Sequence, residues 1–578
     1  MLLYKKMVAL NDQITESYFE KQVVDDHSKY LGGIINVKTG IPSPSHVGTA
    51  AIIAGWVCSY VNPDSKYYQK SSLRFRLNSA LDYMVNQQHE DGTISPGWTN
   101  YHSPPDTAFI VTGFAQIYLL LKEKQSGMVS DLINKVELFL ERTIPAMLNG
   151  GCHTPNHRWV LTSALAHLYN IFEKRELVNR AEEWLLEGID ISEDGEWTER
   201  SNGIYNSVSD IFLYHTAKLL NKPELLDSVR KNLEMMEYLI HPNGEVVTDY
   251  SSRQDFGVKF DLSPYHLIYR LMAVHDNNST FATMADLAVE SLTDMGPANN
   301  HIMLGYLVYP FVQKMEVEKE NLVTDYEVFI NEHYPLSDNL LKMENVGHHS
   351  KIEHSSMHTS FGAPIIRYRK DETSATIMGR TPSFFSLRHG NASLLATQIF
   401  TSFTPGLIEL DSLETIQGGY HLEKLMQKGY KGPIPSQCLS ESIKGKPTES
   451  PWYLLPHQDR ELTHNQYHKL DISILPDRND WIINIRTDER KDVFTQIVFI
   501  FDANGNLSGK GLIPQKNSYF WKDDKLLYEA GGDKITLTSG AHEHWMEDIQ
   551  HINQSHGAQI VKVNLLSPVN KTFHLKLE

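Results

Sequence analysis

The feature that most constrains the fold of this chain is a short phrase that recurs through its first half. Four copies place Ser or Thr before Pro and a fifth lacks the Pro; they begin at Ser43, Ser103, Thr154, Ser207 and Ser263. These starts lie 60, 51, 53 and 56 residues apart. Ser or Thr before Pro is typical of a helix N-cap and first helical residue, because Pro lacks only an amide that has no helical partner there. A period of this length predicts an array of helical hairpins.

Two kinds of helix are expected to alternate in this array. Apolar runs such as 47–61 and 159–172 follow four of the five phrases and predict buried inner helices. Segments such as Arg74–Gln88 and Asp131–Leu148 carry apolar residues at three- and four-residue spacing, which predicts amphipathic outer helices. An inner ring within an outer ring is an (α/α) toroid, here of about six hairpins over residues 1–330. An open solenoid is the alternative, although five or six repeats are few for one.

The spacing of apolar residues changes in the second half. After a charged linker at 331–350, residues 351–578 form short β-branched and aromatic runs separated by Gly, Asn, Asp and Pro. This alternation predicts antiparallel strands, packed face to face as a β-sandwich. The expected fold class is therefore α+β multidomain, with a toroid that carries the catalytic site followed by a β-sheet domain.

Composition excludes several classes of function. The net charge of −18, with no basic stripe, argues against a nucleic-acid partner. No apolar run is long enough to span a bilayer, so no membrane partner is expected. Residues 1–6 lack the apolar core of a secretory signal. We therefore expect a cytoplasmic protein if Met1 is the native start, and a secreted or periplasmic one if a signal peptide was omitted.

Residues suited to catalysis gather after the third phrase. Asn156 and His157 fall in the first turn expected for an inner helix, where free amides and the helix dipole favour an anion. With Arg158 they form a candidate seat for a carboxylate. One repeat later, the polar turn Asp194–Asn206 contains Tyr205, and neighbouring repeats of a ring would place Tyr205 beside His157. The alternative is that Asn156 and His157 cap their helix and Tyr205 packs against it.

These motifs, in a toroid followed by a β domain, resemble the heparinase II/III-like polysaccharide lyases and the related alginate lyases. The resemblance implies β-elimination beside a uronic acid, with Asn156 and His157 neutralising the carboxylate and Tyr205 acting as general acid or as both base and acid. In that family a His of the β domain often completes the site, which implies His389 here. Its competitors for this role are His349, His354 and His358.

The chemistry of elimination suits these side chains. Hydrogen bonds to the uronate carboxylate stabilise the enolate-like intermediate that forms when the weakly acidic C5 proton leaves. A tyrosine has an ordinary pKa of about 10, so it needs a cationic setting to act as a base near neutrality. The expected cations are Arg158, Arg200 and Arg388.

A larger set of residues is predicted to bind substrate. His46, Asp106 and His266 each stand three residues after a phrase start, as do His157 and Asp210, so all five are expected at one end of the ring. The complete set is His46, Tyr101, His102, Asp106, Arg158, Glu199, Arg200, Asn202, His266, Arg388 and Asn391.

Three further points stay open at this stage. The reaction requires no cofactor and no metal at the site, yet the His-rich stretches 347–358 and 541–556 leave a structural metal in the β domain possible. A toroid-type glycoside hydrolase acting on uronate-containing oligosaccharides is the alternative enzyme, using carboxylates such as Asp106, Glu199 and Asp210. A carbohydrate-binding protein is the alternative without catalysis, using Trp98, Tyr101, Trp159 and Trp197. The expected partner in each case is an acidic polysaccharide or oligosaccharide; the oligomeric state is not predicted.

Overall fold

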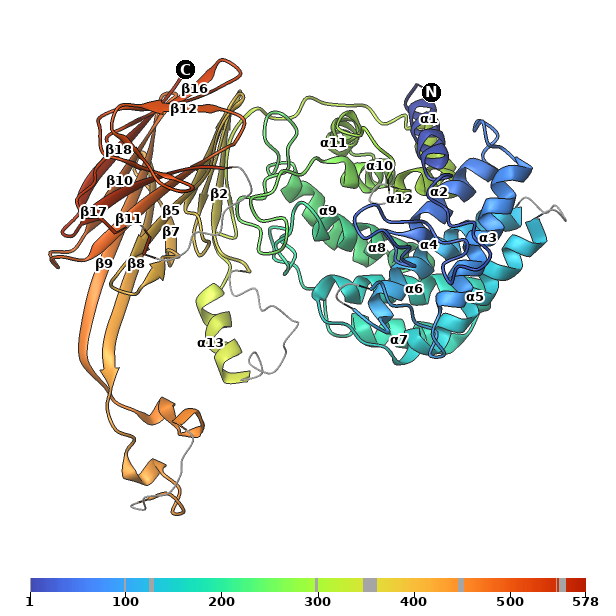
Figure 1. The fold of residues 1–578 in the computed structure, drawn as a ribbon, viewed down its shortest axis with the longest axis horizontal. Helices are drawn as coiled ribbons and strands as arrows, with labels where there is room; N and C mark the ends of the chain where they lie inside the picture. The colour runs from blue at the N-terminus through green and yellow to red at the C-terminus, as the bar shows by residue number, and fades with distance from the viewer. Residues whose placement is uncertain are drawn as a thin grey trace. The chain divides into compact units, whose positions relative to one another are not determined.

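The computed structural model describes residues 2–97, 100–123, 129–296, 300–346, 361–444, 452–546, 548–549 and 558–578. The chain divides into two compact units (Figure 1). The first comprises Met1–Thr324 and His333–Gly362, and the second comprises Asp325–Glu332 and Ala363–Glu578. Strand β1 (Asp325–Ile330) lies within the range that the sequence assigned to the toroid. It belongs to the second unit, because its backbone pairs with a later strand of that unit. The range assigned to the linker contains a helix, α13 (Leu336–Val346).

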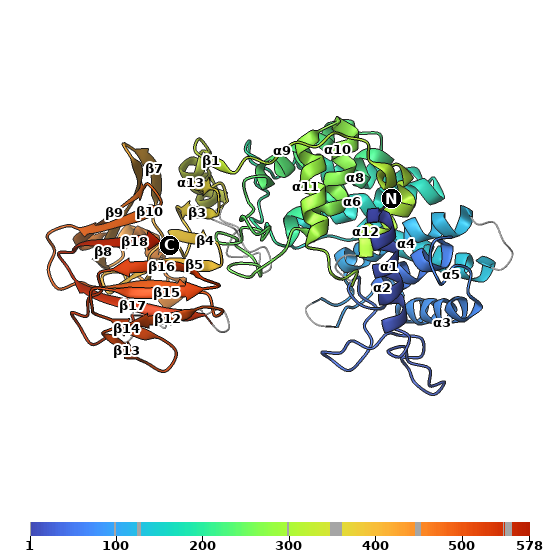
Figure 2. The ribbon, with the colours of Figure 1, turned by 90° about the horizontal axis from the view of Figure 1, so that it is seen from above.

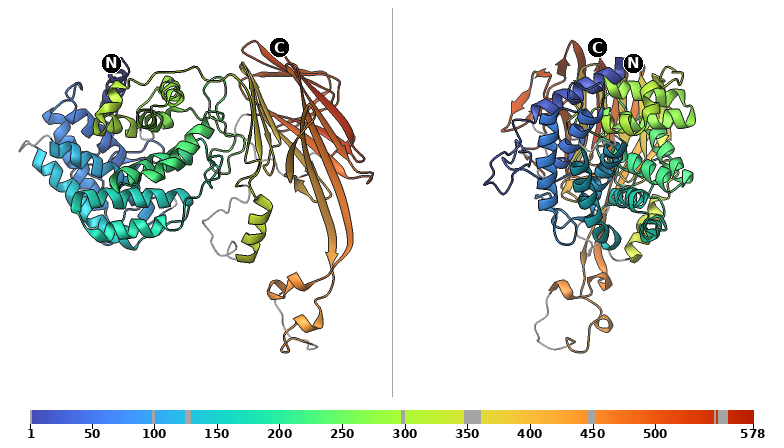
Figure 3. Two further views of the ribbon diagram at one scale, coloured as in Figure 1. Left: turned by 180° about the vertical axis from the view of Figure 1, so that it is seen from behind. Right: turned by 90° about the vertical axis from the view of Figure 1, so that its right-hand side faces the viewer.

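The first unit is a toroid of six helical hairpins, as predicted (Figure 3, right). Its inner helices contact one another in a closed circle in which the last helix returns to the first. They are α2 (Thr49–Val61), α4 (Pro104–Glu123), α6 (Pro155–Phe172), α8 (Tyr205–Leu219), α10 (His266–Asp276) and α12 (Asn300–Val308). The outer helices are α1 (Leu2–Ser17), α3 (Ser71–Gln87), α5 (Ser130–Asn149), α7 (Arg175–Leu185), α9 (Leu226–Met236) and α11 (Ser279–Glu290). The closed circle decides against the open solenoid.

Burial follows the two kinds of helix that the sequence distinguished. Every residue of the inner helix α2 is buried. In the outer helix α7, the buried residues are Leu177, Val178 and Ala181, which lie on one face. An apolar helix is thus enclosed on all sides, and an amphipathic helix keeps one wet face.

The recurring phrases mark the loops that enter the inner helices rather than five equivalent caps. Ser103 does cap α4, since its Oγ accepts a hydrogen bond from the amide of Asp106 at 3.2 Å. Thr154 precedes α6 without a side-chain cap bond, and α2 begins only at Thr49. In the copy without Pro, nothing stops the helix from starting earlier, so α8 begins at Tyr205 and Ser207 lies inside its first turn.

The second unit is a sandwich of two sheets (Figure 2). One sheet consists of β1, β2 (Ile365–Lys370), β3 (Thr373–Met378), β4 (Phe385–His389), β5 (Ala392–Thr401), β6 (Gly406–Leu407), β11 (Phe494–Phe501), β13 (Leu512–Pro514), β14 (Tyr519–Trp521) and β17 (Gln559–Leu566). The other consists of β7 (Ser412–Ile416), β8 (Gly419–Lys431), β9 (Leu462–Asp477), β10 (Asp480–Thr487), β12 (Asn506–Gly509), β15 (Leu526–Ala530), β16 (Asp533–Thr538) and β18 (Asn570–Leu577).

Pairing within these sheets is antiparallel except between β14 and β17. Aromatic side chains from the two sheets meet in a common core, where Phe385 packs against Trp481 with ring centroids 5.3 Å apart and Phe499 against Phe573 at 5.2 Å. The fold class predicted from the sequence is confirmed. Among the described helices, none has the length and apolar character that crossing a bilayer requires.

Candidate active site

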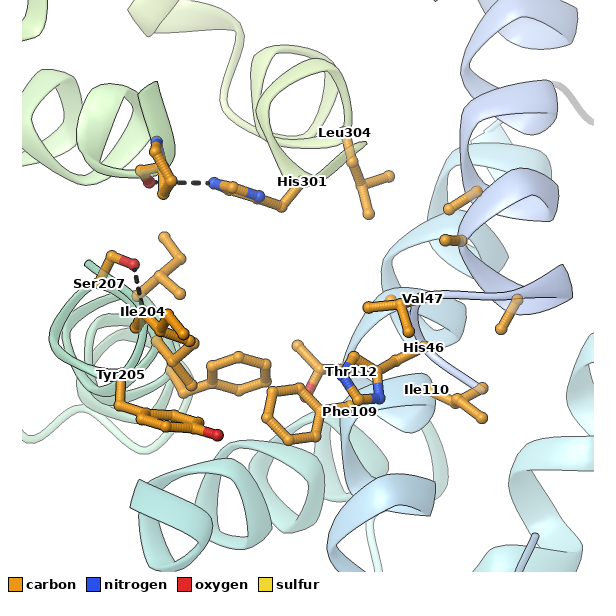
Figure 4. Close-up of a pocket in the computed structure, with 18 of the residues that line it drawn as sticks. His46, Val47, Phe109, Ile110, Thr112, Ile204, Tyr205, Ser207, His301 and Leu304 are labelled. Atoms are coloured by element: carbon orange, nitrogen blue, oxygen red, sulfur yellow. Dashed lines mark hydrogen bonds between the residues drawn. The ribbon is translucent and has the colours of Figure 1, made fainter. Parts of the chain in front are cut away.

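A cavity of about 500 Å³ lies inside the ring of inner helices (Figure 4). Its wall comes from α2, α4, α8 and α12 together with the loops at 46–47, 203–204 and 260–264. Most lining side chains are apolar, and Phe109 stands near the middle of the view. Polar groups on the wall include His46, Tyr205, His215 and His301. A volume of this size is ordinary for a site that binds a small ligand.

Tyr205 lies at the first position of α8, where its hydroxyl points across the cavity toward Phe109 (Figure 4). Its backbone amide donates to Oγ of Ser201 at 3.3 Å. The guanidinium of Arg253 lies over the phenol ring, 4.7 Å from the ring centroid. Arg253 is thus the charged side chain that lies against the ring of Tyr205.

The loop that carries Arg253 is tied to the turn before α8. The buried carboxylate of Asp255 accepts hydrogen bonds from Oγ of Ser201 at 2.9 Å and from the amide of Gly203 at 2.9 Å. The amide of Ser252 donates to the carbonyl of Arg200 at 2.9 Å. These bonds fix the two loops on each other, so Arg253 is held over Tyr205 before any ligand binds.

Asn156 lies buried in the first turn of α6, but its amide is already engaged. Its Nδ2 donates to both carboxylate oxygens of Glu199, each at 2.8 Å, and its Oδ1 has no hydrogen-bond partner. Glu199 also lies 3.8 Å from Nη1 of Arg253. Burial raises the pKa of Glu199, whereas Arg253 and the hydrogen bonds from Asn156 oppose that rise. The helix N-terminus does seat a carboxylate, and that carboxylate belongs to the protein.

His157 follows on the same turn and is a neutral imidazole near pH 7. Burial lowers its pKa to about 4, and the nearby carboxylate of Asp106 opposes the shift. Its ring meets Phe109 edge to face with centroids 6.2 Å apart, and its Nδ1 is buried without a hydrogen-bond partner. A neutral imidazole donates one hydrogen bond from its N–H and accepts one at its other nitrogen, and it adds no fixed positive charge. We refer below to Asn156, His157, Glu199, Tyr205 and Arg253 as the polar cluster.

Of the five residues expected at one end of the ring, three come together around Phe109. The ring of His46 stacks on Phe109 with centroids 4.2 Å apart, and its Nδ1 lies 3.9 Å from Oδ1 of Asp106. Asp106 also accepts hydrogen bonds from Oγ of Ser103 at 2.5 Å and from Nδ2 of Asn100 at 2.8 Å. His157 joins them through its ring contact with Phe109, and of this group His46 and Phe109 line the cavity (Figure 4).

Asp210 and His266 do not join this group. Asp210 is fully buried and accepts a hydrogen bond from the indole of Trp197 at 3.0 Å. His266 is fully buried between the carbonyl of Ala285, at 2.7 Å, and the hydroxyl of Tyr306, at 2.9 Å. Both serve the packing of the toroid, because α8 and η3 (Ser263–Tyr265) begin differently from α4 and so turn the corresponding positions inward.

Two arginines that were expected to supply the cationic setting are committed elsewhere. Arg158 forms ion pairs with Glu187 at 3.1 Å and Asp190 at 2.8 Å. Arg200 is fully buried, 3.3 Å from the carboxylate of Glu196 and over the ring of Tyr250. Each charge is paired with carboxylates of the toroid, and a role of either arginine in binding substrate stays a prediction.

The remaining predicted binding residues of the toroid also have structural partners or point to solvent. Asn202 is buried and donates to the carbonyl of Val247 at 2.8 Å and to the hydroxyl of Tyr250 at 2.9 Å. His102 is exposed and lies 2.9 Å from Asp91, and Tyr101 is exposed beside it. None of these three lines the cavity in the part of the chain that the structure describes.

Solved structures that match nearly the whole of this chain include three lyases. Xanthan lyase from Paenibacillus matches with a TM-score of 0.55 and 10% identity, over 98% of this chain and 56% of that chain. Chondroitin AC lyase from Streptomyces coelicolor A3 matches with a TM-score of 0.50 and 11% identity, over 99% and 79% of the two chains. Heparinase III matches with a TM-score of 0.50 and 10% identity, over 94% and 80%.

This chain has the fold of the polysaccharide lyases. No protein-family model matches its sequence, and a search of curated proteins finds no match either. The resemblance stated from two short motifs is thus confirmed for the architecture, which spans the toroid and the β-sandwich alike.

Sequence reasoning missed Arg253, although a signal for it existed. Arg253 lies 53 residues after Arg200, which is one period of the repeat, and the two loops are hydrogen-bonded side by side. The loop contains no phrase of the kind that marked the helices, and Arg200 itself was taken as the cation.

The predicted site residues of the second unit have contacts within that unit. Nδ1 of His389 lies 2.9 Å from Oγ1 of Thr373 on the neighbouring strand, and Arg388 donates to the carbonyl of Leu394 at 3.1 Å. The amide and Nδ2 of Asn391 both donate to Asp533. Their part in catalysis or binding stays a prediction. Further candidates lie outside the described residues: Trp98, His349, His354 and His358.

One group of described side chains has the ligand types for a metal ion: His421, Glu423 and Asp471 on β8 and β9. The ammonium of Lys469 lies 2.9 Å from Glu423 and 3.1 Å from Asp471, so it already neutralises these carboxylates. The stretch 347–358 lies outside the described residues, as does part of 541–556. A structural metal in the β domain therefore stays a prediction.

Proposed function

We propose that this protein is a polysaccharide or oligosaccharide lyase, which cleaves a glycosidic bond beside a uronic acid by β-elimination and leaves a 4,5-unsaturated uronate. The observation that carries the proposal is Tyr205 at the wall of a ligand-sized cavity with Arg253 fixed over its ring. A phenol beside a cation, next to a helix N-terminus that holds a carboxylate, is the set of groups that this elimination uses. The fold supports the proposal, since its solved neighbours are lyases named for xanthan, chondroitin and heparin.

In the proposed reaction, Tyr205 removes the C5 proton of the uronate and passes a proton to the leaving glycosidic oxygen. The C5–H electron pair forms the C4–C5 double bond as the C4–O bond breaks. Charge that develops on the uronate carboxylate is stabilised by hydrogen bonds from Asn156 and His157. Arg253 stabilises the phenolate that takes the first proton and that the second transfer restores. Protein groups thus supply base, acid and charge, so the scheme needs neither a metal nor a cofactor.

Glu199 has the role of orienting Asn156 in this scheme. Both of its oxygens accept from Nδ2 of Asn156, and it lies beside Arg253, so it links the carboxylate seat to the tyrosine. Nδ2 of Asn156 also donates to Oγ1 of Thr154 at 3.2 Å. A substrate carboxylate at the same helix end has to displace one of these acceptors from Nδ2.

The two alternatives have less support from the described side chains. For a hydrolase, Asp210 is buried against Trp197, Glu199 is bonded to Asn156, and Asp106 accepts hydrogen bonds from Ser103 and Asn100. For a carbohydrate-binding protein, Trp159 and Trp197 are fully buried in the core, and Tyr101 is the exposed aromatic that remains among the described candidates.

A panel of uronate polysaccharides and oligosaccharides tests the proposal. Each is incubated with the wild type and with Tyr205→Phe, while the absorbance of the unsaturated uronate and the number of new reducing ends are followed together. A lyase yields both signals in equal number and loses both in Tyr205→Phe. New reducing ends without the absorbance would show a hydrolase, and binding without either signal would show a non-catalytic protein.

A further inference from the structure

The cavity is uncharged at neutral pH over nearly all of its wall. No Lys or Arg lines it within the described residues, and its single carboxylate, Asp261, accepts a hydrogen bond from the amide of Ser263 at 2.8 Å. Burial lowers the pKa of His46 and of His215, so both imidazoles are neutral. The charges of the site belong to the polar cluster, of which only Tyr205 reaches the cavity wall. A second uronate would have no counter-charge inside the cavity.

Most polar groups on the wall already have partners in the protein. Oγ of Ser207 donates to the carbonyl of Ile204 at 3.1 Å, and His301 lies 3.3 Å from the carbonyl of Pro264 (Figure 4). Nδ1 of His215 lies 2.9 Å from the hydroxyl of Tyr309. A neutral sugar ring with several hydroxyls would therefore find few partners here. An apolar group gives up no hydrogen bonds to water when it enters the cavity.

Small side chains on facing helices leave the space open. They are Ala50, Ala51 and Ala54 on α2 and Gly113 on α4. A Cβ added at Gly113 would meet no atom within 4 Å. Phe109, one turn before Gly113 on α4, and Phe212 on α8 present aromatic surface to the cavity, with their rings edge to face at 5.1 Å.

Resting on the proposed function, we infer that the cavity is a subsite for an uncharged, apolar substituent carried by the uronate substrate. The substituent extends from the reacting sugar past Tyr205 and into the ring, while the carboxylate stays with the polar cluster. Two kinds of group have this chemistry: an acyl ester on a sugar hydroxyl, and an aryl or alkyl aglycone. The preferred substrate is accordingly a uronoside with such a group, and not an unsubstituted polyuronate.

The test compares glucuronides that share one sugar and differ in the substituent. Binding of methyl β-D-glucuronide, 4-nitrophenyl β-D-glucuronide and an O-acetylated methyl β-D-glucuronide is measured by calorimetry with the whole protein. We expect the 4-nitrophenyl or the acetylated compound to bind about tenfold or more tightly than the methyl compound. The compound that gains affinity identifies the source of the apolar group.

Variants at Gly113 show whether the gain comes from the cavity. Gly113→Ala and Gly113→Leu fill it stepwise and replace a helical glycine by better helix formers, so the fold is retained. Gly55→Ala is the matched control, since Gly55 lies on α2 and does not line the cavity. The preference should shrink in Gly113→Ala and vanish in Gly113→Leu, with the affinity for methyl glucuronide unchanged.

Two results would overturn the inference: equal affinities for the three compounds in the wild type, or a preference that survives Gly113→Leu. Because binding is measured and not turnover, the outcome is separate from that of the proposed function. If the protein shows the preference but forms no double bond on any uronate, the subsite is supported and the lyase function is contradicted. If it forms the double bond but shows no preference, the lyase function is supported and the subsite is contradicted.

Discussion

The polar cluster and the cavity are neighbours in one toroid, yet the cluster contains paired charges and the cavity wall is almost free of charge. The cluster brings Glu199 and Arg253 within 3.8 Å of each other and sets both beside hydrogen-bonding groups. The cavity wall is mostly apolar, and most of its polar atoms are satisfied within the protein. Tyr205 stands between them and belongs to both. In the two proposals above, the toroid therefore places the proton transfers at the polar cluster and the binding of an apolar substituent in the cavity.

The largest effect should follow from removing the hydroxyl that joins the two regions. Tyr205→Phe keeps the ring and its stacking with Arg253, so folding should be unchanged while elimination falls by about 10²-fold or more. Turnover and melting temperature are measured on one preparation. A stable variant with near-normal elimination would assign the proton transfers to another group, with His389 the first to examine.

Next in size are substitutions in the carboxylate seat. Asn156→Ala and His157→Ala should each lower kcat by about 10- to 10²-fold with a smaller change in KM, because their hydrogen bonds strengthen as the carboxylate gains enolate character. Steady-state kinetics on the best substrate of the panel decide the matter. If KM alone rises, the seat binds the ground state and has no special role in the transition state.

A smaller effect is expected from Arg253→Gln. This change removes the positive charge that lies against the ring of Tyr205, so kcat/KM near neutrality should fall about tenfold. Arg158→Gln is the matched control, because Arg158 pairs with Glu187 and Asp190 away from the cluster. Equal kcat/KM values for the wild type and Arg253→Gln would remove Arg253 from the mechanism.

The last prediction concerns stability and leaves catalysis untouched. Burial lowers the pKa of His167 to about 3, against about 6.5 in an unfolded chain, so the unfolded state takes up a proton first as the pH falls. The stability that this group contributes is complete above pH 6.5 and declines toward pH 3, by about 2 kcal/mol at pH 5. His167→Leu should reduce the loss of stability between pH 7 and pH 5 in urea unfolding. If the wild type and His167→Leu lose the same free energy of unfolding between pH 7 and pH 5, His167 is excluded as a source of acid sensitivity.

The fold could be predicted from the sequence further than the site could. Apolar and amphipathic helices alternate at a fixed period, and that regularity is enough to predict a toroid of six hairpins. The direction of a side chain in a loop depends on local turn geometry, which no period records. Arg200, with φ of 44°, turns into the core, whereas Arg253 reaches the ring of Tyr205.

The carboxylate seat shows the same limit in another form. The position of Asn156 at a helix N-terminus was enough to predict an anion there. The identity of that anion was beyond the sequence, because Glu199 lies 43 residues away and meets Asn156 only when α6 and α8 pack together. His46, Asp106 and His157 converge around Phe109, and Asp210 departs because its helix starts early.

The closed circle of inner helices has a consequence for how the protein acquires its site. Helix α12 contacts α2 and α4, so the ring is completed by segments that are separated by most of the length of the toroid. Closing so long a loop is entropically costly and slow, and its contacts form late in folding. Leu304 of α12 is part of the cavity wall, so a nascent chain that has made only its first hairpins has an open cleft in place of a chamber. Recognition of an apolar group then becomes a property of the finished ring, and it cannot be inherited by any fragment that lacks the final hairpin.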